Sequence, residues 1–196
     1  PLILVVLVSS VGTVLYLKGL SVNNISFSGI LFSFSIVVSS TLGIVFFSES
    51  TSLMKLLGLV LILVAIIGVN VDNLNLEKNH KFALFGGLLF GLVYTIDKKI
   101  IGTVSPLVYL FWAFFVISLF VTIVYPKRFF SDIKKAKFKD YLPIVFSGVG
   151  YSIYNLSTFK AYVLGGEVGR IDAINNSQVF LIIIFEYLVM KHTKGL

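Results

Sequence analysis

The sequence contains no cysteine among its 196 residues. A disulfide framework and a cysteine-ligated metal are therefore excluded, and the redox compartment cannot be inferred. Charged residues are also scarce, at 13% of the chain, against about a quarter in a typical soluble domain. With 57% apolar and 15% aromatic residues and a mean hydropathy of +0.99, the chain lacks the surface of a water-soluble protein. The composition favours a bundle of transmembrane helices.

Catalytic patterns are missing as well. The two histidines, His80 and His192, fall in connecting or terminal segments, and the sequence holds no HExxH motif, P-loop or nucleophile elbow. We therefore expect no enzyme, no metal site and no cofactor.

Positive charge is in excess, with 16 Lys and Arg against 9 Asp and Glu. In a soluble protein a net charge of +7 would suggest nucleic-acid binding. Here the basic residues fall mainly between apolar runs, where they anchor helices at the membrane–water boundary. We expect the lipid bilayer as a partner rather than nucleic acid, and a multi-pass integral protein of the plasma (inner) membrane.

The gaps between charges divide the chain into apolar segments long enough to cross a bilayer, for which about 20 helical residues suffice. An all-α polytopic bundle is therefore predicted. Its seven expected helices cover residues 2–20, 26–47, 52–71, 82–101, 106–125, 141–163 and 171–190. Residues 126–140 are expected to form one long basic loop at the membrane surface.

An internal repeat relates the two ends of the chain. A shift of 142 residues lays Leu17–Leu20 over Phe159–Tyr162 and superposes several polar residues inside apolar helices. The shift pairs the first helix with the sixth and the second with the seventh. Because paired helices five spans apart run in opposite directions, this is an inverted repeat, an architecture common in secondary transporters. Two helices are then expected before Pro1 and one after Leu196.

The segment Phe46–Gly68 resembles the end of an EamA domain, the five-helix unit repeated in the drug/metabolite transporter superfamily. The family has a Gly-Glu turn followed by an apolar helix with glycine near each end. Glu49, Gly58 and Gly68 match this pattern, and Ser48 replaces the usual glycine.

In the second half of the chain His192 occupies the position of the glutamate. The resemblance extends from the third helix of the family through the ninth. It implies that residues 1–71 are the end of a first EamA repeat and that residues 82–196 are a second repeat without its last helix.

The seventh expected helix carries polar residues inside an apolar segment. At about 100° per residue, one stripe contains Asp172, Asn175, Asn176 and Glu186. Ionisable groups within a membrane helix suggest a function, so Asp172 and Glu186 are candidates for proton coupling. Alternatively, Asp172 is an anion near a helix N-terminus, Glu186 snorkels or pairs with lysine, and the asparagines are interhelical hydrogen-bond groups.

A second stripe follows the sixth helix and offers hydroxyl, amide and aromatic groups for a small organic molecule. It contains Ser147, Tyr151, Tyr154, Asn155, Thr158 and Tyr162. Under the repeat, the first helix presents Ser9, Thr13 and Tyr16 to the same central space. Packing against a neighbouring helix is the alternative explanation for both stripes.

Three further features are weaker. Lys18 and Lys160, equivalent under the repeat, attract an anionic substrate or snorkel. A GxxxG pattern at Gly87 and Gly91 is typical of close helix approach and suggests a homodimer. Two arguments predict opposite orientations in the membrane. The positive-inside rule puts the face with most of the basic residues in the cytoplasm, whereas the topology of the family puts that face outside.

The sequence thus predicts a secondary transporter that moves small organic metabolites or drugs by alternating access. Two other classes stay open: a membrane enzyme acting on lipid-linked substrates, and a non-transporting scaffold subunit whose polar stripes join helices.

Overall fold

The computed structural model describes residues 2–20, 25–71, 78–181, 184 and 187–188. All the regular structure in these ranges is helical, in the order α1 (Leu2–Leu20), α2 (Ile25–Phe32), α3 (Phe34–Phe47), α4 (Leu53–Val71), α5 (Lys78–Ile101), α6 (Pro106–Val124), α7 (Pro126–Lys135), α8 (Phe138–Val163) and α9 (Val168–Asn176).

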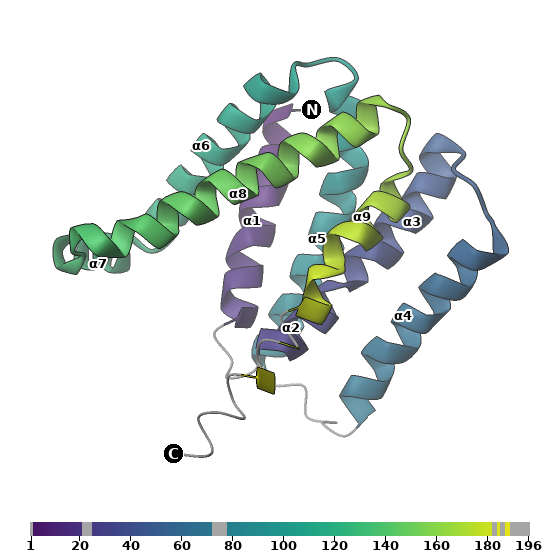
Figure 1. Ribbon diagram of the computed structural model, residues 1–196, viewed down its shortest axis with the longest axis horizontal. Coiled ribbons are helices and arrows are strands. Elements are labelled where there is room, and N and C mark those ends of the chain that lie inside the picture. Colours follow the sequence, from purple (N-terminus) through teal and green to yellow (C-terminus); the bar gives the residue numbers. More distant parts are fainter. Residues whose placement is uncertain (1, 21–24, 72–77, 182–183, 185–186, 189–196) are drawn as a thin grey trace.

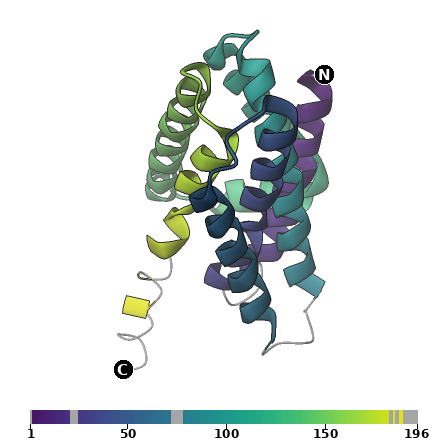
Figure 2. The same ribbon diagram turned by 90° about the vertical axis from the view of Figure 1, so that its right-hand side faces the viewer.

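Helix α5 lies at the centre of the bundle (Figures 1 and 2) and packs against α1, α2 and α3. Helix α9 lies along α3, and α4 lies at the outer edge against α2 and α3. Helices α6 and α8 pack together and extend away from the other helices, with α7 at their far end. The largest apolar cluster joins α1, α5, α6, α8 and the start of α9.

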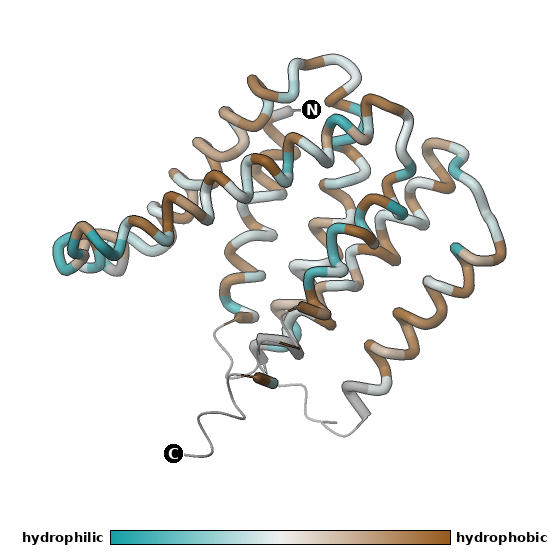
Figure 3. The backbone as a smooth tube through the Cα atoms, viewed as in Figure 1, coloured by the Kyte–Doolittle hydropathy of each residue, from teal (hydrophilic) through white to brown (hydrophobic). Residues whose placement is uncertain are grey.

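The surface of the bundle is apolar, as expected for contact with lipid. Figure 3 shows apolar residues running along α4, while hydrophilic residues gather at α7. Within the described residues, three segments are long and apolar enough to cross a membrane, namely Ile3–Leu20, Ser28–Phe47 and Pro106–Val124, and Leu53–Gly68 is a shorter apolar helix. The prediction of an all-α polytopic membrane bundle is confirmed.

Small hydroxyl residues fill the interior instead. Ser10, Ser28, Ser35, Ser39 and Ser40 are almost fully buried. Their small volume lets helices approach closely, which is how membrane helices gain packing energy without a hydrophobic driving force. Ser10 shows how such a hydroxyl is satisfied, because its Oγ donates to the Val6 carbonyl at 2.7 Å.

Two expected helices differ from the prediction because each is kinked at a serine. The second is divided at Ser33, whose Oγ donates to the Gly29 carbonyl at 3.1 Å. The seventh begins at Val168 rather than residue 171 and is interrupted at Ser177, whose Oγ donates to the Ile174 carbonyl at 2.6 Å. Such hydroxyl-to-backbone bonds compete with the helical pattern and bend helices.

The expectation of a long loop over 126–140 was wrong. Proline at the first helical position favours helix initiation, and α7 begins at Pro126. Phe129, Phe130 and Ile133 expose apolar side chains among basic residues, a composition typical of a helix lying in the membrane interface. In the sequence, the many charged residues over 126–140 made this amphipathic pattern hard to recognise.

The GxxxG glycines are used inside the chain. A Cβ on Gly87 would lie 2.6 Å from the Phe32 carbonyl oxygen, and one on Gly91 would lie 2.6 Å from the Val38 Cβ. The motif therefore brings α5 against α2 and α3. The motif therefore does not support a homodimer, which stays a prediction.

Candidate functional site

A cavity of about 460 Å³ opens between α1, α2, α5 and α8. Its size falls within the range of small-molecule sites. No charged side chain lines it; its lining residues are Thr13, Tyr16, Phe32, Phe90, Tyr94, Ser147, Gly150, Tyr151, Tyr154 and Gln178.

Aromatic rings form two walls of this cavity. On one side Phe32 contacts Tyr16 and Phe90, with ring centroids 4.5 and 5.3 Å apart. On the other side Tyr151 and Tyr154 are stacked at 5.7 Å. Such walls suit a flat or amphipathic organic molecule, whose polar groups the tyrosine and threonine hydroxyls can bind.

The structure brings together five residues of the two predicted stripes, Thr13, Tyr16, Ser147, Tyr151 and Tyr154. Sequence reasoning missed Phe32, Gln178 and the α5 pair of Phe90 and Tyr94. The aromatic i, i+4 spacing of that pair on one helix face was an available signal, but periodicity does not distinguish a cavity face from a packed one.

Asp172 lies next to the cavity, fully buried on α9. Its carboxylate accepts hydrogen bonds from Ser39 Oγ at 2.7 Å and Asn176 Nδ2 at 2.6 Å. Asn176 also reaches Ser35 Oγ at 3.4 Å. The predicted residues Asp172 and Asn176 therefore form a buried polar cluster that joins α9 to α3.

Other predicted site residues bond within or between helices and do not line the cavity. Ser9 Oγ donates to the Val5 carbonyl, Asn155 Nδ2 to the Tyr151 carbonyl, and Asn175 Nδ2 to Thr158 Oγ1 at 3.2 Å. The last bond joins α9 to α8, as the alternative of interhelical hydrogen-bond groups expects. Glu186 lies outside the described residues.

A cluster of charges closes one end of the bundle, and we call it the Glu49 cluster: Glu49, Lys55, Lys98, Glu167 and Arg170. The Glu49 carboxylate accepts bonds from Lys98 Nζ and Lys55 Nζ, both at 3.0 Å, and from the Val168 backbone N–H at 2.6 Å. Lys55 also pairs with Glu167 at 3.2 Å, and Arg170 pairs with Glu167 at 3.0 Å.

Electrostatics favour the charged form of Glu49. Burial by itself raises the pKa of this carboxyl, but the bonds from the Val168 N–H, Lys98 and Lys55 outweigh burial and place the pKa below its ordinary value of 4.5. Glu49 was recognised only as a family motif residue; Lys98 and Val168 lie far along the chain from it, where sequence spacing gives no indication of these contacts.

The turn before Glu49 explains its position. Ser48 ends α3 with φ 52°, the left-handed conformation in which the family has glycine. The chain then folds back so that the Glu49 carboxylate lies against Gly43, where a Cβ would be 2.5 Å from Oε2. Glycine at position 43 is thus required for the carboxylate to reach its partners.

Cavity, buried cluster and charges are stacked along the same helices. From the cavity toward the charged end, the α2–α3 segment presents Phe32, then Ser39, then Glu49. Helix α9 and the residues directly after it present Gln178, then Asp172, then Val168, in the reverse chain order. The two elements therefore run in opposite directions and form the same layers.

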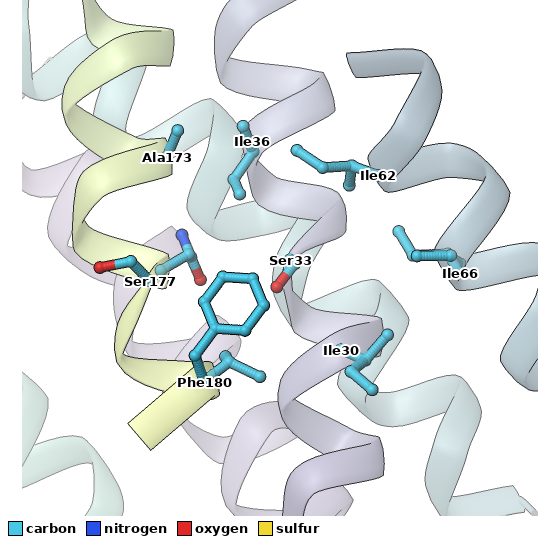
Figure 4. A pocket seen from close by; sticks show the side chains of 11 residues that line it. Ile30, Ser33, Ile36, Ile62, Ile66, Ala173, Ser177 and Phe180 are labelled. Carbon is cyan, nitrogen blue, oxygen red and sulfur yellow. The ribbon is translucent and has the colours of Figure 1, made fainter. Parts of the chain in front are cut away.

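A second pocket of about 280 Å³ lies between α2, α3, α4 and α9 (Figure 4). Its walls are mainly apolar, with isoleucines facing the Phe180 ring. Both kink residues, Ser33 and Ser177, line it. The two kinks therefore lie against the same space.

Among the described residues no group of three or more His, Cys, Asp or Glu side chains is placed to hold a metal ion. A bundle of apolar helices around an uncharged aromatic cavity, with a buried carboxylate beside it, is the architecture of a polytopic membrane transport protein.

The sequence profile of the EamA-like transporter family matches residues 79–195, more than half of the chain. The chain belongs to this family and is an integral membrane transporter of the drug/metabolite transporter superfamily. The match covers the second predicted repeat; the division into two repeats stays a prediction. No curated protein and no solved structure matches the chain.

Proposed function

We propose that this protein moves small organic metabolites across the plasma (inner) membrane by alternating access, with the aromatic cavity as the substrate site. The proposal is supported by one observation: both predicted repeats contribute residues to the cavity lining. Thr13, Tyr16 and Phe32 come from the first predicted repeat, and Tyr94, Tyr151 and Tyr154 come from the second. A site shared by two repeats can close on one side while it opens on the other.

The Glu49 cluster supplies the closed end in this proposal. Glu49 and Lys55 belong to the first predicted repeat, and Lys98, Glu167 and Val168 belong to the second. Opening this end requires these bonds to break. Ion pairs are suited to such opening, because water replaces the lost partner. Their net free energy is therefore small compared with the attraction between the two charges.

The kinks supply hinges. Ser33 and Ser177 lie one in each predicted repeat, 144 residues apart, close to the 142-residue shift of the repeat. Residues at helix interruptions absorb the backbone changes of domain motion. Asp172, buried between the hinges and the charged cluster, is the proposed proton-coupling carboxylate; Glu186 keeps the same proposed role.

The substrate class follows from the lining. Stacked rings and hydroxyl groups suit a small aromatic or amphipathic molecule, and the absence of lining charge disfavours a strongly charged one. No cofactor or catalytic group belongs to the proposal. An enzyme on lipid-linked substrates would need free acidic and basic groups that converge, whereas Glu49, Lys55, Lys98 and Glu167 are engaged with one another.

Substrate protection of an introduced cysteine tests the proposal, because the chain has none of its own. Thr13→Cys places a thiol in the cavity, and a panel of aromatic amino acids, nucleosides and phenolic acids is added during maleimide labelling. Slower labelling with one compound class supports the site. Ser131→Cys on α7 is the control and should label at an unchanged rate. Labelling of Thr13→Cys that no compound slows would favour the scaffold alternative.

A further inference from the structure

A second buried carboxylate lies in the bundle, at a position that sequence reasoning did not single out. Asp97 is on α5, 6% exposed, and accepts a hydrogen bond from the Tyr109 hydroxyl of α6. Asp172 is on α9 and 0% exposed. Two buried carboxylates therefore come from different helices of the second predicted repeat.

The Tyr162 hydroxyl relates these two carboxylates. Tyr162 of α8 is 5% exposed and interacts electrostatically with both Asp97 and Asp172. Its hydroxyl has no hydrogen-bond partner in the described part of the chain. A buried hydroxyl without a partner is unfavourable, and in native structures such a group calls for a ligand or a role. The carboxylates of Asp172, Asp97 and Glu49 all act on it electrostatically.

The charge balance at this place indicates what is bound. The neighbouring cations are engaged elsewhere, since Lys98 and Lys55 pair with Glu49 and Arg170 pairs with Glu167. Two ionised carboxylates buried inside the bundle would be costly without a cation. The described residues offer no metal-binding group of three, whereas a proton needs a single carboxylate oxygen.

We propose that Asp97 is a second proton-binding group of this transporter and acts with Asp172 across the Tyr162 hydroxyl. Both carboxyls carry a proton while the Glu49 cluster is closed. Opening of that end admits water, and a proton is released to it. The proposal deepens the proposed function, on which its role in coupling rests, and assigns two buried proton sites where the sequence suggested Asp172 with Glu186.

The groups that face the two carboxylates come from every helix packed around them. The titratable and charged ones are Tyr94 and Lys98 of α5, Tyr109 of α6, Tyr151, Tyr154 and Tyr162 of α8, and Glu49 of the α3–α4 turn. Helix α3 contributes hydroxyls, with Ser39 bonded to Asp172. Of the three carboxyls named here, Glu49 is paired with Lys55 and Lys98, whereas Asp97 and Asp172 have no ion-pair partner among the described residues.

Infrared difference spectroscopy of the full-length protein in lipid tests this directly. A pH change should produce bands of two buried protonated carboxyls. Asp97→Asn should remove one band and Asp172→Asn the other. Tyr109→Phe, which removes only the hydroxyl bonded to Asp97, should shift the first band, and Tyr162→Phe should shift both. Asp132→Asn on the exposed face of α7 should change neither. A spectrum in which neither Asp97→Asn nor Tyr109→Phe alters a band would overturn the proposal.

Transport separates this proposal from the proposed function. In proteoliposomes, Asp97→Asn should abolish accumulation driven by a pH gradient, whereas Asp132→Asn should accumulate substrate as the parent does. A protein that shows both carboxyl bands but moves no compound contradicts the proposed function and leaves Asp97 a proton site. A protein that moves substrate without the Asp97 band contradicts this proposal alone.

Discussion

The Glu49 carboxylate accepts a hydrogen bond from the Val168 backbone N–H at 2.6 Å, across 119 residues of sequence. The same carboxylate binds Lys55 and Lys98. One buried side chain therefore holds together the turn after α3, the end of α5 and the start of α9. We regard this contact as the interaction that keeps this end of the bundle closed.

Removal of the Glu49 charge should favour opening of this end of the bundle. Glu49→Gln leaves the Lys98 charge without its carboxylate partner and Lys55 with Glu167 alone, which costs about 3 kcal/mol, roughly a hundredfold in the closed population. Val168→Cys, fully buried in the closed form, reports the opening. We expect its labelling by a membrane-impermeant maleimide to be slow in the parent and fast with Glu49→Gln.

Arg170→Gln is the matched control, because it removes an exposed ion pair worth little in water. It should leave the labelling of Val168→Cys nearly unchanged. Equal labelling rates in the parent and in Glu49→Gln would show that Glu49 does not hold this end closed.

Acidification should have the same effect through titration of Glu49. Its pKa in the folded protein lies below 4.5, so its stabilisation is complete above that value and is lost as the pH falls through the folded pKa. The thermal unfolding midpoint of the purified protein should drop in this acidic range. In Glu49→Gln the unfolding midpoint should drop less in this range, because the contribution of the Glu49 charge is already lost. The same pH profile in the parent and in Glu49→Gln would contradict this role of Glu49.

Ser48→Gly should stabilise the protein. A non-glycine residue in the left-handed conformation costs about 1 kcal/mol, and Ser48 has φ 52°. We expect a higher unfolding midpoint in thermal melts. Ser131→Gly within α7 should act in the opposite direction, since glycine inside a helix costs about 0.5–1 kcal/mol. A midpoint lowered by Ser48→Gly would contradict the backbone explanation.

The aromatic cavity wall should contribute to substrate affinity. Tyr154→Ala removes a ring stacked on Tyr151, and we expect KM to rise about tenfold, or about 1.4 kcal/mol. Tyr154→Phe keeps the ring and should have a smaller effect. Phe130→Ala, an exposed ring on α7, serves as the control. A KM unaffected by Tyr154→Ala would remove this wall from the site.

Sequence reasoning predicted the helical bundle and part of the cavity, because both depend on local signals. Apolar length located the helices, and polar side chains inside apolar helices identified Asp172, Tyr151 and Tyr154. What it missed depends on contacts between distant segments. Two partners of Glu49, Lys98 and Val168, lie 49 and 119 residues away, and Asp97 stood beside two lysines, where its burial against Tyr109 was not apparent.

The kinks escaped prediction for a related reason. Serine is common in helices, and only the structure shows that the helices are interrupted at Ser33 and Ser177, each of which bonds to a carbonyl of the preceding turn. Many other serines of this chain bond to their own helix without breaking it, as Ser10 does. The difference lies in the tertiary setting and not in the residue type.

The central claim, transport through the aromatic cavity, is tested most directly by flux in proteoliposomes of the full-length protein. Radiolabelled aromatic amino acids, nucleosides and phenolic acids are loaded in turn, and counterflow is measured at equal pH on both sides. The account predicts saturable counterflow of at least one class, weakened by Tyr154→Ala and unchanged by Phe130→Ala. Counterflow that Tyr154→Ala and Phe130→Ala leave equally unaffected, or no counterflow of any class, would contradict it.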